Sequence, residues 1–283
     1  MQAISKPFDD DHDHWQAWVE AFRAERASKQ MVLGFAETRC AIFVCMGQRQ
    51  QHRGKHPDDD RLFSAKWLPV LREAVADLSY LLSRGYADKA SLKVVGDHYQ
   101  LATRQRRAVS GAACSDASLA RRAAHHVAVE ELTGESVAVD GYNLLIIAES
   151  TLSGGVLLRG RDGCIRDLAS VHGSYHRVLE TTEAIRVLGE AFGQLKPERV
   201  TWHFDAPVSN SGRLAALMRE AAEANGWPWT VRLDHGVDRR LAASESVVVT
   251  SDSWILDRVA RWTNVKGFLV DWVGAKESLV DLG

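Results

Sequence analysis

The stretch SVAVDGYNLLI, Ser136–Ile146, decides the fold of the second half of the chain. Its first residues are small or β-branched, which is typical of a buried strand, and the strand stops at Asp140. An ionised carboxylate at the end of a buried strand is costly unless it caps a helix, occupies a turn or meets a cation. Asp140 is therefore a candidate for a functional site, and Asn143 follows it three residues later.

From Gly134 onward, short β-branched runs alternate with helical patterns. Such alternation implies βαβ crossovers and a mostly parallel sheet between helices, which is a three-layer α/β/α arrangement. The runs on either side of Arg161-Asp162-Gly163 predict a hairpin. The expected strands are SVAVD, RVTWHFD, WTVRLD and SVVVTSD; the expected helices are TTEAIRVLGEAFGQL (capped by Thr181 or Thr182), SGRLAALMREAAEANG and DSWILDRVARWT; KGFLVDW completes the set.

The preceding part of the chain reads as helical. Apolar residues recur at helical spacing in LPVLREAVADLSYLLSRGY, and KASLKVVGDHYQLATRQRRAVSGAACSD predicts two short helices, the second with Thr103 as N-cap. Between Lys89 and Ala124, seven Lys and Arg residues stand against two Asp, although the whole chain has a net charge of −2. We expect an N-terminal extension over 1–55, a basic helix-turn-helix-like module over 56–130 and an α/β domain over 131–283.

Length and composition set the class of protein. A chain of 283 residues, 46% hydrophobic and 25% charged, is long enough for one large globular domain or two ordinary ones. Its longest apolar runs are shorter than the ~18 residues of a membrane helix, so we expect no membrane association. The four cysteines form no CxxC pair, which favours a reducing cytoplasm. The extension is expected to be poorly ordered, with Met46 as an alternative start.

Four expected strands finish with an aspartate, namely Asp140, Asp205, Asp234 and Asp252. The carboxyl ends of parallel strands share one edge, where ligands bind. Clustered carboxylates repel unless a cation lies among them, and hard oxygen donors select Mg²⁺ or Mn²⁺. Such an ion activates water for attack on a phosphodiester. Each acid alone is equally well a helix N-cap or turn residue. Asp234 is the weakest member, and Asp238 in GVDRRL is preferred to it.

Several of these motifs resemble a known family. VDGYNLL resembles the first-strand motif of PIN-like nucleases, especially their NYN branch, and TSD resembles a later strand motif whose acid completes the metal site. HFDAPVSNSG and VDRRL occupy the places of intermediate acids. The resemblance covers roughly residues 134–272 and implies a PIN-like α/β fold and nuclease activity. It implies that Asp140, Asp238 and Asp252 bind metal, that Asp205 is a further or outer ligand, and that Asn143 is an orienting group.

From about Gly54 onward the chain also resembles a bacterial and archaeal family defined as a domain of unknown function, in which a helical part precedes the PIN-like part. RGYADKASLKVVGDHYQL, ACSD and VHGSYHR carry this resemblance. The hairpin and VHGSYHR are not usual PIN elements. Glu149 and Glu180 are alternative occupants of the acidic position given to Asp238.

Three groups of residues are candidates for contacts with nucleic acid. The arginines of the second short helix suit a phosphate backbone, VHGSYHR suits phosphates or a stacked base, and VSNSG precedes a helix N-terminus that favours an anion. The structural alternatives are a solvated helix face, a glycine turn with one buried aromatic, and ordinary capping. His203 is expected to be a packed strand histidine. The candidates are Arg104, Arg106, Arg107, His172, Tyr175, Arg177, Ser209 and Ser211.

Together these features predict a metal-dependent nuclease that hydrolyses phosphodiester bonds, with RNA as the expected partner and a homo-oligomer compatible with the sequence. Aspartyl phosphoryl transfer is excluded because Tyr142 stands where a second acid is needed, and DGYN lacks the glycine-rich turn of dinucleotide-binding proteins. The alternative is a non-catalytic nucleic-acid-binding regulator with a ligand-sensing or dimerising α/β domain. That alternative takes precedence if Asp140, Asp205 and Asp252 do not converge on one pocket.

Overall fold

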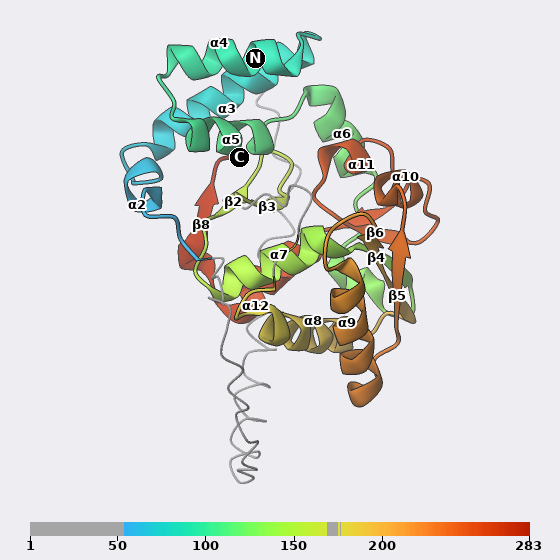
Figure 1. Ribbon diagram of the computed structural model, residues 1–283. Helices are drawn as coiled ribbons and strands as arrows, with labels where there is room; N and C mark the ends of the chain where they lie inside the picture. Colours follow the sequence, from blue (N-terminus) through green and yellow to red (C-terminus); the bar gives the residue numbers. More distant parts are fainter. Residues whose placement is uncertain (1–53, 169–174, 176) are drawn as a thin grey trace. The chain divides into compact units, whose positions relative to one another are not determined.

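A helical part precedes an α/β part in the computed structural model, which describes residues 54–168, 175 and 177–283 (Figure 1). The expected fold class is confirmed: the protein is mixed α/β, with N-terminal helices and a parallel sheet in its C-terminal region. The expectations that the N-terminal extension is poorly ordered and that Met46 is an alternative start concern residues outside the described ones. The helices of the first part are α2 (Asp59–Leu62), α3 (Leu68–Ser83), α4 (Asp88–His98), α5 (Thr103–Ala112) and α6 (Asp116–Ala124).

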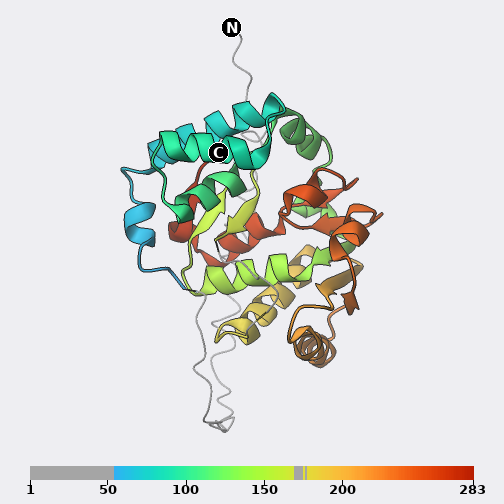
Figure 2. The same cartoon turned by 45° about the horizontal axis from the view of Figure 1, so that its top comes forward.

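The helical part shares a hydrophobic core with a small second sheet. Leu71, Leu78 and Val109 pack in one cluster with Leu158 and Leu282, and two views place α5 next to this sheet, with α4 farther from it (Figures 1 and 2). The expected hairpin is confirmed, because β2 and β3 pair antiparallel. The last strand of the chain adds to β2 in parallel. The sheet has the order β3-β2-β8, formed by β2 (Leu157–Arg159), β3 (Ile165–Asp167) and β8 (Leu279–Asp281).

The main sheet has five strands, all parallel, in the order β5-β4-β1-β6-β7. Because β1 is central, its carboxyl end lies between those of β4 and β6. Asp140 pairs in register with His203, and Val139 pairs with Val249, so Thr250 follows directly beside Asp140. The strands are β1 (Ser136–Asp140), β4 (Arg199–Asp205), β5 (Trp229–Asp234), β6 (Val247–Val249) and β7 (Trp262–Thr263).

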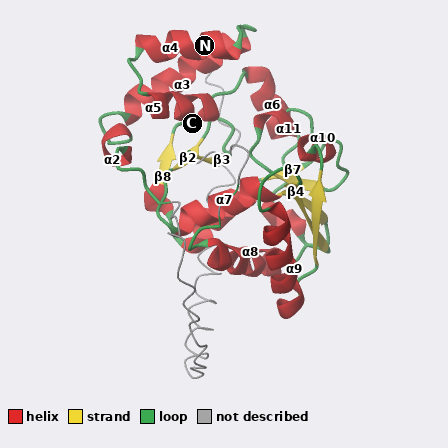
Figure 3. Cartoon of the chain, in the orientation of Figure 1, coloured by secondary structure: helices red, strands yellow, loops and turns green. Residues whose placement is uncertain are grey.

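Helices cover both faces of the main sheet (Figure 3). On one face Ala138 and Val248 pack with Leu241 and Leu256. On the other, Trp202 lies edge-to-face against Phe192 of α8. The helices of the α/β part are α7 (Gly141–Leu152), α8 (Thr181–Leu195), α9 (Ser211–Asn225), α10 (Val237–Ala242), α11 (Ser253–Leu256) and α12 (Val265–Val273), with 3₁₀ turns η1 (Val129–Leu132) and η2 (Lys276–Ser278).

Some local expectations were wrong. Thr103 is the first residue of α5, not its cap, and the N-cap is Ala102, whose N–H donates to Gln105. Likewise α8 begins at Thr181 after Glu180. The helix expected over DSWILDRVARWT ends at Leu256, because Trp262 pairs with β6 and its N–H donates to the carbonyl of His125. None of the helices that the structure describes is long and apolar enough to cross a membrane.

Candidate functional site at the carboxyl edge of the main sheet

Asp140 is held at the end of β1 by a neighbour on the next strand. Its Oδ2 accepts a hydrogen bond of 2.8 Å from the Thr250 hydroxyl. The carboxylate makes no capping hydrogen bond to α7, although the nearby N–H of Asn143 favours its charged form. Burial raises the pKa of Asp140 to about 6; Lys266 and Thr250 act to lower it, and the charge of Asp252 raises it further. The Asn143 N–H and the Thr250 hydroxyl together therefore do not offset the burial of this acid.

Asp252 lies on the segment that follows β6, and it does cap a helix. Its Oδ1 accepts from the N–H groups of Trp254 and Ile255, at 2.8 and 3.1 Å. The Asp252 N–H donates in turn to the Thr250 hydroxyl at 3.0 Å, so one threonine contacts both acids of the edge. Both capping bonds use Oδ1, and the side chain is exposed. The N-cap alternative is thus correct for Asp252 without excluding a ligand at its other oxygen.

The charges of other edge acids act on Asp238, whereas Asp234 has basic partners. Asp234 accepts from His203 Nδ1 at 2.7 Å and lies 3.3 Å from Arg240 Nε, so it already has two partners. Asp238 is exposed in the first turn of α10. Burial, followed by the charges of Asp252 and Asp205, raises the pKa of Asp238. His203 is a buried strand residue, as expected.

Lys266 is the residue of this region that sequence reasoning missed. It is 1% exposed in α12, and its Nζ donates to Asn143 Oδ1 and, at 2.6 Å, to the Ser251 hydroxyl. Asn143 Oδ1 also accepts from the Ser251 N–H at 2.7 Å. Burial lowers the pKa of Lys266, and the charge of Asp140 opposes this. Asn143 and Lys266 therefore join α7, α12 and the segment after β6. The one signal was a lysine within the apolar run VKGFLV.

The buried hydroxyl of Tyr142, near Asp205, lacks a hydrogen-bond partner among the described residues. Tyr142 is 8% exposed. Burial and the charge of Asp205 raise its pKa to about 12, so the hydroxyl stays protonated as a donor. A buried donor without an acceptor costs free energy. A buried water beside the ring would satisfy it.

The acids of the edge lie in electrostatically coupled pairs. The charge of Asp252 raises the pKa of Asp140, and the charges of Asp252 and Asp205 raise the pKa of Asp238. As these side chains stand, no three Asp, Glu, His or Cys residues of the described chain are grouped closely enough to hold a metal ion. Their carboxylate oxygens suit Mg²⁺ or Mn²⁺ in donor chemistry, and two of the four side chains, Asp238 and Asp252, are exposed. Binding of an ion would require these carboxylates to draw together.

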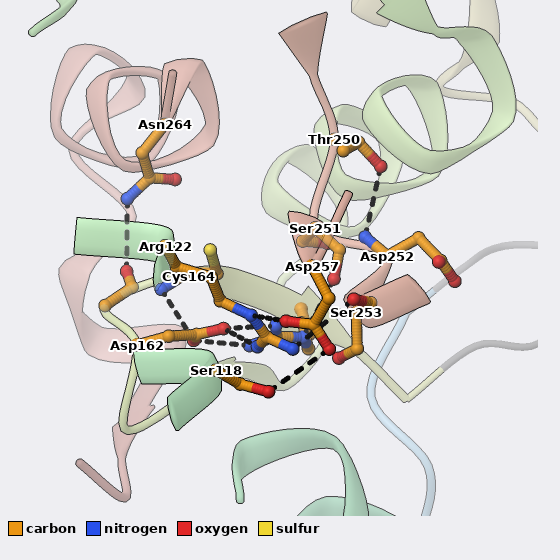
Figure 4. Close-up of polar contacts among 12 residues, drawn as sticks. Ser118, Arg122, Asp162, Cys164, Thr250, Ser251, Asp252, Ser253, Asp257 and Asn264 are labelled. Carbon is orange, nitrogen blue, oxygen red and sulfur yellow. Dashed lines mark hydrogen bonds and ion pairs between the residues drawn. The ribbon is translucent and has the colours of Figure 1, made fainter. Parts of the chain in front are cut away.

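A buried arginine–aspartate cluster supports the segment that carries Asp252 (Figure 4). Arg122 of α6 contacts Asp162 of the hairpin, and its Nε donates to Asp257 Oδ1 at 2.8 Å. Arg166 of β3 binds Asp162 through two nitrogens, at 2.8 and 2.6 Å. Arg166 also donates to the Ser251 carbonyl at 3.0 Å, and Arg122 to that of Ser253 at 3.4 Å. The helical part and the hairpin thus reach the backbone on both sides of Asp252.

Most of the residues expected to contact nucleic acid have partners within the chain. Arg104 binds the buried Asp59, and Arg106 binds Asp97 at 2.9 Å, whereas Arg107 is exposed. Tyr175 is 1% exposed with its hydroxyl on Glu149, so its ring is not available to stack a base. The remaining candidates are Ser211, which is buried and donates to the Ala206 carbonyl; Arg177, which is exposed and donates to Thr182; Ser209, which is exposed; and His172, which lies outside the described residues.

The two other acids considered for the edge have different surroundings. Glu149 is fully buried in α7, where it accepts from Thr181 Oγ1 at 2.6 Å and from Tyr175. Glu180 precedes α8 as its N-cap residue. Glu149 therefore ties α7 to the start of α8, and Asp238 stays our preferred further acid.

Gly141→Ala should destabilise the protein by about 1–3 kcal/mol. A Cβ at Gly141 would lie 2.5 Å from the ring of Phe204, which is fully buried and cannot move aside easily. The glycine therefore lets α7 start directly against β4. Urea unfolding measures the effect. Gly212→Ala is the matched control, because a Cβ there meets no atom within 4 Å; equal stability of the two variants would contradict the close-packing argument.

The fold and the site define a class of protein: a helical part followed by a parallel α/β part whose sheet edge carries carboxylates. Residues 129–268 match the family described as Domain of unknown function (DUF5616), and residues 70–124 match that described as Protein of unknown function (DUF434). The chain is 30% identical over 203 residues to "Uncharacterized protein MJ0935" of Methanocaldococcus jannaschii, which covers 72% of this chain and 94% of the archaeal protein. The chain therefore belongs to the same family as that protein. No solved structure matches it.

Proposed function

We propose that the chain is a divalent-metal-dependent nuclease that hydrolyses phosphodiester bonds, with RNA as its substrate, and that its α/β part is PIN-like. One observation carries the proposal: Asp140, Asp205, Asp238 and Asp252 belong to one sheet edge, where the charge of Asp252 helps to raise the pKa values of Asp140 and Asp238, and the charge of Asp205 adds to the effect on Asp238. Of these four acids, Asp140 has the buried charge of Lys266 nearby, whereas Asp234, the acid of this edge with two basic partners, is not one of the four.

The proposed division of labour follows from the contacts. Asp140, Asp252, Asp238 and Asp205 would hold the ion, which when bound supplies charge neutralisation and an activated water. Lys266 and Asn143 keep the segment after β6 in place, so that Asp252 faces Asp140. The protonated Tyr142 hydroxyl is a buried donor for a water near Asp205.

Asp140→Asn should reduce Mn²⁺- or Mg²⁺-dependent cleavage of RNA by roughly 100-fold or more, because the amide removes one ligand charge. The assay uses the full chain on mixed RNA and DNA oligonucleotides, with calorimetric titration of Mn²⁺ as a second readout. Asp234→Asn is the control, because that strand-end acid is already bound by His203. Absence of metal-stimulated cleavage by the parent, or equal cleavage by Asp140→Asn, overturns the proposal.

One observation favours a second candidate. The acids form coupled pairs and no tight triad as they stand, which would suit a regulator that binds nucleic acid without cutting it. Mn²⁺ titration separates the two functions. A regulator of this kind binds oligonucleotides equally well with Asp140 or Asn at position 140, and it shows no metal-dependent hydrolysis.

A further inference from the structure

A large aromatic side chain is exposed beside the acidic edge. Trp254 in α11 is 42% exposed, two residues after Asp252, and its backbone N–H donates to the Asp252 carboxylate at 2.8 Å. Tryptophan side chains are largely buried in most folded proteins, and exposed indoles commonly mark contact surfaces. The direct hydrogen bond fixes the position of the Trp254 backbone relative to Asp252.

The guanidinium group of Arg258 makes a cation–π contact with the indole of Trp254. The guanidinium carbon of Arg258 lies 4.2 Å from the centroid of the Trp254 ring. Arg258 Nη1 also donates to the Trp254 carbonyl at 2.9 Å. The arginine therefore covers part of the ring and restrains its rotation, while 42% of the residue stays exposed. Arg258 is itself exposed, so it presents positive charge at the same place.

The short helix α11 packs against α10 through buried apolar side chains. Ile255 and Leu256 are fully buried and pack in one cluster with Val237 and Leu241 of α10. The same α10 carries Asp238 and the exposed Arg239. The indole of Trp254, the exposed Arg239 and Arg258, and the acids Asp238 and Asp252 thus belong to α10, α11 and the residues that flank α11. This combination matches single-stranded nucleic acid, in which bases stack on aromatic rings and phosphates meet guanidinium groups.

We propose that Trp254, restrained by Arg258, is a stacking platform for an unpaired base of a single-stranded nucleic acid. A base on this ring places its neighbouring phosphate near the Asp252 edge. In a duplex the base faces are covered by their neighbours, so the platform selects single strands. What happens to the bound strand rests on the proposed nuclease function, whereas the binding does not.

The chain offers a matched control for this platform. Tyr80 of α3 is 58% exposed, and the guanidinium of Arg84 lies 5.2 Å from its ring centroid. It is a second exposed aromatic–arginine pair, but it belongs to the helical part and not to the helices that carry Asp238 and Asp252. Tyr80→Ala should therefore leave oligonucleotide binding unchanged.

The test measures fluorescence anisotropy of labelled single-stranded RNA, single-stranded DNA and duplex oligonucleotides in EDTA, where metal-dependent cleavage is suppressed. The parent should bind the single strands more tightly than the duplex. Trp254→Ala should weaken single-strand binding at least about 5-fold, within the range found for loss of one stacked base. Trp254→Phe should retain most of it, and Trp254→Leu, which keeps apolar bulk without a flat ring, should not. Circular dichroism checks that each variant is folded.

Each outcome decides one proposal separately from the other. Unchanged single-strand binding by Trp254→Ala and Trp254→Leu overturns the platform, even if Asp140-dependent cleavage is found. Equal binding of duplex and single strands overturns the selectivity. Weakened binding by these variants together with no cleavage by the parent supports the platform and overturns the nuclease function.

Discussion

Asp162→Asn should unfold about 3–5 kcal/mol more easily than the parent protein, which is the usual cost of removing one partner from a buried ion pair. The carboxylate of Asp162 is 2% exposed and binds both Arg122 and Arg166. Without it, two largely buried guanidinium groups face each other with one remaining acid, Asp257. Urea unfolding at pH 7 measures the loss. Asp116→Asn is the control, because its exposed pair with Arg161 contributes at most about 1 kcal/mol.

The same acid predicts how stability changes with pH. Burial alone would raise the pKa of Asp162, but Arg166 and Arg122 outweigh it and hold the pKa at about 2, below the ordinary 3.8. The unfolded state therefore binds the proton more readily, so the stabilisation is fully present above about pH 4 and is lost as pH falls towards 2. Asp162→Asn should lack this acid-sensitive part. A parent and variant with parallel stability curves from pH 5 to pH 2 would contradict the assignment.

The cluster should also matter for the edge. Because Arg166 and Arg122 donate to the carbonyls of Ser251 and Ser253, weakening them should loosen the backbone that carries Asp252. Hydrogen exchange in residues 250–256 is expected to speed up in Asp162→Asn more than in α9, which the cluster does not contact. Equal acceleration throughout the α/β part would indicate only a global loss of stability.

Lys266→Met should cost about 3 kcal/mol of stability at neutral pH, because it removes a buried charge from its partners. Asn143 Oδ1 and the Ser251 hydroxyl lose a donor, and Asp140 loses the nearest buried positive charge. Thermal and urea unfolding measure the effect. Lys276→Met is the control: its side chain is half exposed and lies 3.2 Å from Asp271, so its loss should cost at most about 1 kcal/mol.

Manganese gives this variant a second readout. If the edge acids bind a divalent ion, Mn²⁺ should restore part of the stability lost in Lys266→Met, since a ligand that binds only the folded state stabilises it by mass action. The ion would supply positive charge close to Asp140. No stabilisation by Mn²⁺ in either parent or variant would argue against a metal at this edge.

Sequence reasoning identified the elements whose signals are local. Alternating β-branched runs indicated the parallel strands, and the Arg161-Asp162-Gly163 turn indicated the hairpin, because both depend on residues within a few positions of one another. The positions of Asp140 and Asp205 at strand ends were read in the same way. Helix boundaries were less accurate where tertiary pairing competed with local pattern, as at Trp262, which became a strand residue beside β6.

The sequence by itself determined a helical part, a mostly parallel sheet and an edge where strand after strand ends in an acid. Only the tertiary structure decided which charges neutralise which. Lys266 meets Asn143 from 123 residues away, and Arg122 meets Asp257 from 135 residues away. The physical reason is that periodicity records which face of an element is buried, whereas the partner of a buried charge is set by where distant elements pack. The same packing places His203 and Arg240 against Asp234. It also brings Asp238 within reach of the charges of Asp252 and Asp205.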